Sequence, residues 1–173
     1  MTFAFSQKSI DKLQGVHPDL LKIVNLAIVK TPVDFGITEG VRSAKQQAIF
    51  YHNGASERLV SRHMTGHAVD VLAYLGARGT YKPESLYFQI ANAFLAAAKE
   101  LKIPLEWGGA FGRDLTKFNS AEDAKKNYDL SRLGRKKFFD GVHFNLLDAT
   151  HPADPKVVSI LEDDVRNELD LLG

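Results

Sequence analysis

The chain has no cysteine among its 173 residues, which excludes disulfide bonds and every thiolate metal site. Any bound metal would therefore depend on histidine, aspartate and glutamate side chains. No stretch approaches the roughly 18 consecutive apolar residues that a membrane-spanning helix needs. The first residues also lack the basic start and apolar core of a secretory signal peptide. We therefore expect a protein made in the cytoplasm, without a signal peptide and without membrane insertion.

A large excess of one charge is also missing. The 22 basic and 21 acidic residues give a formal net charge of +1. This balance, together with the lack of a known nucleic-acid-binding motif, argues against a nucleic acid as partner. The length, with a hydrophobic content of 45%, is enough for one globular domain that buries its own core.

Hydrophobic periodicity and capping residues divide the chain into short strands and helices of unequal length. We expect helices over residues 6–13, 18–30, 44–52, 83–101 and 154–172, and strands over 35–38, 67–75, 103–109 and 140–147. Residues 110–137 are polar and charged and predict an irregular surface excursion. Without regular βαβ spacing, the pattern favours an α+β fold in which helices flank a small, mostly antiparallel sheet.

The most distinctive segment is SRHMTGHAVD, residues 61–70. His63 and Asp70 are seven residues apart, and Gly66 permits a tight turn that brings His63 towards the strand holding Asp70. Buried histidine and aspartate need partners, which a metal ion or a hydrogen-bonded core could supply. A second segment, DGVHFNLL, offers His143 as a third ligand and Asp140 as a base facing the attacking water.

Four motifs together resemble a known family. SRHMTGHAVD meets all five fixed positions of the Ser-x-His-x-x-Gly-x-Ala-x-Asp signature of zinc peptidases that cut bacterial cell-wall peptides. This group comprises D-alanyl-D-alanine carboxypeptidases and dipeptidases, and phage L-alanyl-D-glutamate endopeptidases. DGVH resembles their second signature, GVRS their arginine after the first strand, and EWGG their Trp-Gly-Gly strand end. The motifs occur in the family's order.

The resemblance implies that one Zn²⁺ ion is held by His63, Asp70 and His143 on a face of the sheet. It implies that Asp140 is the base that activates the attacking water and later protonates the leaving amine. Arg42 would polarise the scissile carbonyl and stabilise the oxyanion, a role for which a fixed cation is suited.

Three further residues are placed by the same signatures. Ser61 and Trp107 resemble residues that support the orientation of substrate or ligands. His67 occupies a variable position of the signature, so we do not expect it to bind the metal.

Two features favour the phage endopeptidases within this group. The base position holds Asp140 instead of glutamate, and the opening residues resemble the N-terminal helices of those enzymes. We therefore expect a monomeric phage or prophage endolysin that cuts the L-alanyl-D-glutamate bond of bacterial peptidoglycan. It would stay in the host cytoplasm until lysis releases it to the wall.

Two alternatives remain open at this stage. One is a D-alanyl-D-alanine carboxypeptidase. The other is a non-catalytic zinc-binding module of the same fold, as in the hedgehog signalling domain. Such a module would need the three ligands but neither Asp140 nor Arg42, so the presence of both favours catalysis.

The chain divides unequally into two parts. We expect a zinc peptidase domain over residues 1–148 and a C-terminal helical extension over 149–173. The extension carries an apolar stripe and is too short to form its own core, so we expect it to pack against the peptidase domain or to form a dimer contact.

Overall fold

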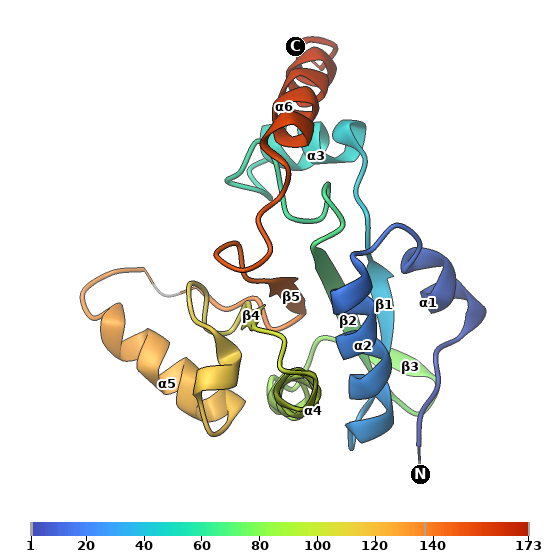
Figure 1. The fold of residues 1–173 in the computed structure, drawn as a ribbon, viewed down its shortest axis with the longest axis vertical. Coiled ribbons are helices and arrows are strands. Elements are labelled where there is room, and N and C mark those ends of the chain that lie inside the picture. The colour runs from blue at the N-terminus through green and yellow to red at the C-terminus, as the bar shows by residue number, and fades with distance from the viewer. Residues whose placement is uncertain (1, 137, 173) are drawn as a thin grey trace.

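The structure, a computed structural model, describes residues 2–136 and 138–172. Lys137, at the end of the expected excursion, therefore lies outside the described residues, as do Met1 and Gly173. Figure 1 shows a small sheet surrounded by helices, with the C-terminal helix at one end of the long axis.

The sheet has five strands, and every pairing is antiparallel. The strands are β1 (Asp34–Glu39), β2 (Ala68–Leu75), β3 (Arg78–Thr80), β4 (Leu105–Trp107) and β5 (His143–Leu146). Their order is β1-β2-β5-β4, with β3 pairing to β2. The predicted α+β fold with a small antiparallel sheet is confirmed.

The helices are α1 (Gln7–Lys12), α2 (Pro18–Lys30), α3 (Ala44–His52), α4 (Ser85–Leu101), α5 (Ala121–Ser131) and α6 (Pro155–Asp170). A short 3-10 helix covers Leu115–Lys117. The side chains of Ser6 and Ser43 accept backbone N–H groups at the starts of α1 and α3 and so act as N-caps. None of the helices within residues 2–136 and 138–172 has the length and apolar content needed to cross a bilayer.

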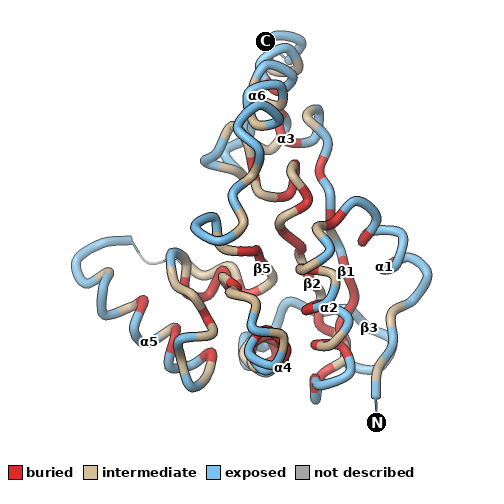
Figure 2. Tube along the Cα trace, in the orientation of Figure 1, coloured by how far each residue is buried: buried red, intermediate tan, exposed pale blue. Residues whose placement is uncertain are grey.

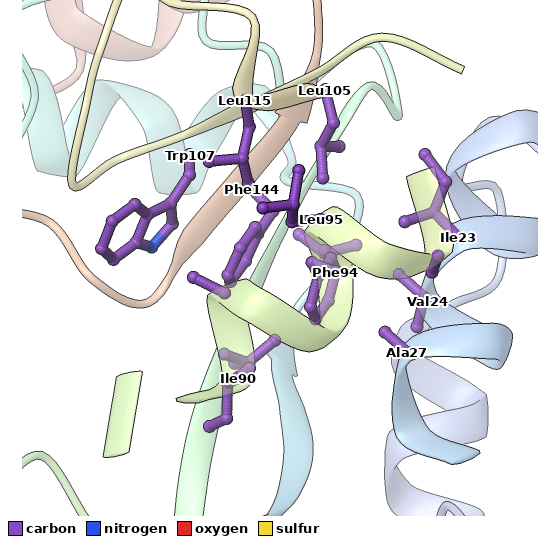
Figure 3. Packing of buried hydrophobic residues seen from close by; sticks show 14 of the residues in the cluster. Ile23, Val24, Ala27, Ile90, Phe94, Leu95, Leu105, Trp107, Leu115 and Phe144 are labelled. Atoms are coloured by element: carbon purple, nitrogen blue, oxygen red, sulfur yellow. The ribbon is translucent and has the colours of Figure 1, made fainter. Parts of the chain in front are cut away.

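The main core lies between the sheet and the helices α2 and α4 (Figure 3). Phe94 of α4 stacks on Phe144 of β5 with ring centroids 3.9 Å apart. Val69 and Val71 of β2 are fully buried in the same cluster. Because side chains alternate along a strand, residues between these positions point to the other face of the sheet. Figure 2 shows that burial follows the sheet and these two helices.

The prediction of an irregular excursion was wrong over α5. Ser120 caps this helix, and Ala121, Ala124 and Tyr128 are buried at intervals of three and four residues. Asn92 of α4 accepts the backbone N–H of Ala121 at 2.7 Å. Only these three residues of α5 are buried, and the rest of the helix is mostly polar. The sequence therefore shows no clear helical periodicity.

The C-terminal helix α6 packs against α3, at the opposite end of the molecule from α4 (Figure 1). Val165 of α6 and Ala48 of α3 are fully buried, and together with Met64 they form a second, small hydrophobic cluster. Leu161 and Leu169 pack against its edge. This pairing of α3 and α6 provides the contact that the apolar stripe of the extension requires.

Candidate active site

Strand register places two of the expected ligands side by side. Asp70 of β2 is the direct antiparallel partner of His143 of β5. Residues opposite each other in such a pair have their Cβ atoms about 5 Å apart. Since Val69 and Phe144 occupy the core face, Asp70 and His143 project from the other face.

His63 joins them from the loop that precedes β2. Its backbone N–H donates to the Ser61 hydroxyl at 3.1 Å, and Gly66 turns the chain with a positive φ of 73°. The His63 ring is almost fully buried, and its Nδ1 lies 2.9 Å from the Gly40 carbonyl oxygen. An N–H donated to this carbonyl leaves the Nε2 lone pair free for a metal.

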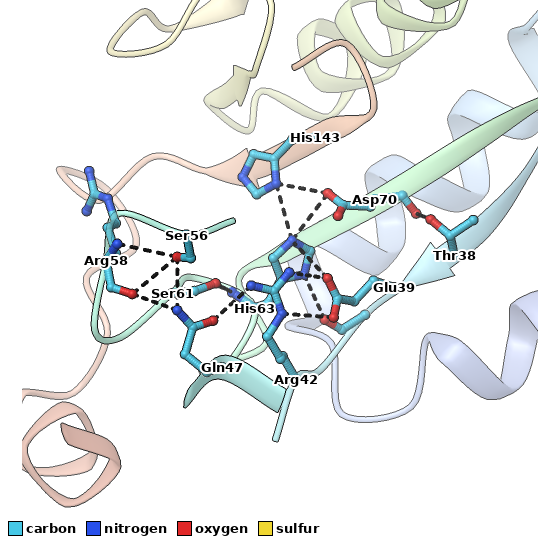
Figure 4. A network of polar contacts seen from close by, with 11 residues as sticks. Thr38, Glu39, Arg42, Gln47, Ser56, Arg58, Ser61, His63, Asp70 and His143 are labelled. Carbon is cyan, nitrogen blue, oxygen red and sulfur yellow. Dashed lines mark hydrogen bonds and ion pairs between the residues drawn. The ribbon is translucent and has the colours of Figure 1, made fainter. Parts of the chain in front are cut away.

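Three ligand atoms converge (Figure 4). His63 Nε2 lies 3.2 Å from both His143 Nδ1 and Asp70 Oδ1, and the last two atoms are 2.9 Å apart. Two imidazole nitrogens and one carboxylate oxygen are ligands that a divalent zinc ion accepts, with a fourth position left for water. Within the described residues this is the one group of at least three such side chains that could hold a metal.

The electrostatics of the group favour a charged aspartate. Burial alone would raise the pKa of Asp70, but hydrogen bonds from His143 and His63 outweigh it and hold that pKa below its ordinary value. Burial lowers the pKa of His143, yet the hydrogen bond to Asp70 reverses this and leaves the pKa raised. The carboxylate is therefore anionic and ready to bind a cation.

Asp140 stands beside this group and lines the same cleft. Its backbone N–H donates to the Gly108 carbonyl at 3.0 Å, and its own carbonyl accepts from His143 N–H at 3.2 Å. A Cβ atom on Gly108 would lie 2.2 Å from the Asp140 carbonyl oxygen, so only glycine permits this approach. Burial raises the pKa of Asp140, with a further contribution from Asp70, while His143 acts in the opposite direction. A carboxyl group with a raised pKa is suited to proton transfer.

Arg42 is held on the opposite side of the site. Its Nε donates to Glu39 at 2.8 Å, its Nη2 also donates to Glu39, and its Nη1 donates to Gln47 Oε1 at 2.8 Å. The guanidinium also covers the Phe50 ring, 4.6 Å from its centroid. Three of its five N–H groups are thus occupied, and the remaining two are available to a substrate oxygen.

Glu39 and Gln47 were not recognised in the sequence. Glu39 becomes a neighbour of the site because β1 pairs it with Asp70. Gln47 is fully buried on α3, and its amide nitrogen donates to the Arg58 carbonyl at 2.6 Å. The three-residue spacing from Glu39 to Arg42 was the one local signal for this ion pair.

The cleft has a volume of about 410 Å³. The three ligands, Asp140 and Arg42 line it, but Ser61 and Trp107 do not. Ser61 supports His63 through the hydrogen bond described above. Trp107 is fully buried, and its indole N–H donates to the Gly141 carbonyl at 2.9 Å, which anchors the loop between Asp140 and His143.

An α+β fold that gathers a His-Asp-His group, a separate carboxylate and an anchored arginine in one cleft defines a hydrolase with a candidate metal site. The chain belongs to the phage L-alanyl-D-glutamate peptidase family, whose model matches residues 1–147. A relative from Escherichia phage T5, an L-alanyl-D-glutamate peptidase, is 33% identical over 111 residues, which cover 62% of this chain and 81% of the relative.

A solved structure extends the comparison to nearly the whole fold. The L-Ala D-Glu endopeptidase ChiX of Serratia marcescens matches with a TM-score of 0.70 and 35% sequence identity. The match covers 88% of this chain and 96% of ChiX. This chain is therefore a peptidase with the fold of that endopeptidase.

Proposed function

We propose that this protein is a zinc-dependent endopeptidase that hydrolyses the L-alanyl-D-glutamate bond of the bacterial peptidoglycan stem peptide. The observation that carries the proposal is the convergence of His63, Asp70 and His143 beside Asp140 in a chain of this peptidase family. The activities for which the T5 and ChiX relatives are named support the choice of bond.

Each residue of the cleft has a role in this reaction. A zinc ion held by His63, Asp70 and His143 would supply Lewis acidity, which polarises the scissile carbonyl and lowers the pKa of the attacking water. Asp140 takes the proton of this water and then delivers it to the leaving nitrogen of D-glutamate. Arg42 donates its free N–H groups to the carbonyl oxygen as negative charge develops there. Glu39 and Gln47 keep the guanidinium in place.

Ser61 and Trp107 act indirectly in this proposal. Ser61 orients His63 through its backbone, and Trp107 fixes the loop that carries Asp140 and His143. Both therefore affect the position of the ligands and of the base without contacting the substrate.

We further propose that the protein acts as a monomer, since one chain contributes every residue of the site. We also propose that it remains in the host cytoplasm until lysis releases it to the wall. The phage source of the T5 relative supports this location.

Digestion of purified peptidoglycan, followed by mass spectrometry of the released peptides, tests the proposed activity. We expect new amino termini at D-glutamate, lost when a chelator removes the metal and restored by zinc. Release of a single terminal D-alanine would replace the proposal with a carboxypeptidase. A zinc-replete protein that releases no peptide from any wall type would indicate a non-catalytic module.

A further inference from the structure

The cleft contains one cation that the reaction described above does not use. Two residues with positively charged side chains line it, Lys12 and Arg42. Arg42 is paired with Glu39 and is largely buried. Lys12 is exposed at the end of α1, and its ammonium group makes no hydrogen bond or ion pair with the residues that the structure describes.

The backbone of Lys12 is fixed close to the ligand His63. Its carbonyl oxygen lies so near Gly40 that a Cβ atom there would be 1.9 Å away. The same glycine presents its own carbonyl to His63 Nδ1 at 2.9 Å. The end of α1 is therefore held against the turn that supports the metal group. Lys12 is an exposed residue of the cleft lining, and its long, flexible side chain starts from this fixed point.

The charges of the cleft favour an anionic substrate once a metal is bound. Three carboxylates line it, Glu39, Asp70 and Asp140, against the two cations Lys12 and Arg42. The carboxylates exceed the cations by one, so a divalent ion leaves the cleft with one net positive charge. Because Arg42 is already neutralised by Glu39, the unpaired positive charge at the rim belongs to Lys12.

The proposed substrate carries one anion next to the scissile bond. In the stem peptide, D-glutamate continues the chain through its γ-carboxyl group, so its α-carboxylate is free. This carboxylate is attached to the same carbon atom as the scissile nitrogen. In some cell walls it is amidated to D-isoglutamine and is then neutral. A cation at the rim could distinguish these two forms.

The structure assigns Lys12, in our inference, to binding the free α-carboxylate of D-glutamate, which makes it a determinant of specificity for stem peptides that are not amidated. The inference rests on the proposed function, because the α-carboxylate of D-glutamate lies next to the scissile bond only if the L-alanyl-D-glutamate bond is the one cleaved. Lys12 does not contact the reacting atoms and has no part in the chemical step.

The test compares two soluble stem peptides that differ only in a D-glutamate α-carboxylate or the corresponding amide. We expect Lys12→Gln to lower kcat/KM for the carboxylate peptide about two- to fivefold, the size of one exposed ion pair, mainly through KM. The value for the amidated peptide should not change. Lys8→Gln is the matched control, because Lys8 is an exposed lysine of the same helix that does not line the cleft.

A second readout does not need turnover. In an Asp140→Asn background, the dissociation constant of the uncleaved carboxylate peptide should rise with Lys12→Gln by a similar factor, and that of the amidated peptide should not. Equal losses for both peptides, or an equal effect of Lys8→Gln, would overturn the assignment of Lys12. A wild-type protein that cleaves neither peptide, yet releases D-alanine from walls, would instead overturn the proposed function and the inference with it.

Discussion

The two sides of the catalytic cleft rest on different hydrophobic clusters. Asp70 and His143 extend from strands whose opposite face forms the main core, where Val69 and Phe144 are fully buried. Arg42 follows β1 and is held by Gln47 of α3. That helix is supported from behind by the small cluster it shares with α6 (Figures 1 and 4).

This difference separates the ligands Asp70 and His143 from the group that faces the substrate oxygen, whereas the third ligand, His63, directly precedes Met64 of the small cluster. The family model ends at residue 147, so α6 lies beyond the part of the chain that it matches. The arginine side of the cleft is therefore supported by a segment outside the family's common region. We expect substitutions behind Arg42 to affect the Asp70–His143 pair less than they affect Arg42 itself.

His143→Ala should have the largest effect, because it removes a ligand from the side that rests on the main core. Two remaining ligands cannot hold zinc with comparable affinity, so both bound zinc and peptidase activity should be lost. Metal analysis and digestion of peptidoglycan measure the two losses in the same preparation. An active, zinc-replete variant would contradict the ligand assignment.

Asp140→Asn should separate catalysis from metal binding on the same side. The amide keeps the shape of the side chain but cannot accept the proton of the attacking water. We expect zinc content to remain near one per chain while kcat falls about 10²- to 10⁴-fold. A near-normal kcat would exclude Asp140 as the base.

Val165→Ala tests the other side. Val165 is fully buried between α6 and α3, so the cavity should lower the free energy of unfolding by about 1–3 kcal/mol. Activity should fall modestly because Arg42 is held less firmly, while zinc affinity should fall less, since Asp70 and His143 rest on the main core. Val157→Ala is the control, because Val157 is 44% exposed on the same helix, and it should change stability by less than about 0.5 kcal/mol.

Removal of residues 149–173 extends this test to the whole helix. We propose that the extension is no independent domain, so its loss should reduce stability more than it changes cleavage specificity. A stable truncated protein that cuts a different bond would show that the extension belongs to the substrate site.

The elements that carry the candidate metal ligands could be predicted from local sequence patterns. Side chains alternate between the two faces along residues 67–75, which predicts Asp70 on one face and Val69 and Val71 on the other. The structure has this arrangement. Gly66 and the family signature predicted that His63 lies at the same site. These features depend on short stretches of chain, in which period and turn chemistry are visible.

The environment of Arg42 could not be predicted in this way. Glu39 and Gln47 lie only three and five residues from Arg42, yet no motif marked either of them as its partner. Their place beside the metal ligands follows from the pairing of Glu39 with Asp70, a contact between segments distant in sequence. Trp107 illustrates a third case, since a motif identified the residue but not its burial or its hydrogen bond to Gly141.

A cluster of histidines lies between the main core and the segment that leads to α6. His17 caps α2 of the main core, His67 precedes β2, and His151 lies in the segment leading to α6. The ring centroid of His17 lies 5.0 Å from that of His67 and 5.4 Å from that of His151. Arg62 also reaches this junction, where it donates to the His151 carbonyl at 2.9 Å.

The smallest effect we predict is a pH dependence of this junction. Burial lowers the pKa of His67, and the positive charge of Arg62 and the neighbouring His17 and His151 add to the shift. The unfolded chain therefore binds a proton more readily than the folded one below the ordinary histidine pKa of about 6.5. The stabilising contribution is complete above that pH and is lost as the pH falls towards the folded pKa of His67.

Thermal unfolding between pH 7.5 and 5 measures this loss. The groups that surround His67 include the acceptor Thr65, whose hydroxyl lies 3.0 Å from its Nδ1, and Asp19, which pairs with His151. Neither offsets the desolvation of the His67 ring. His67→Gln should therefore flatten the decrease in Tm on acidification, whereas His52→Gln, at an exposed histidine at the end of α3, should leave the slope unchanged. If both variants keep the wild-type slope, the pH dependence of stability arises elsewhere, and the junction between the two regions does not respond to protonation of His67.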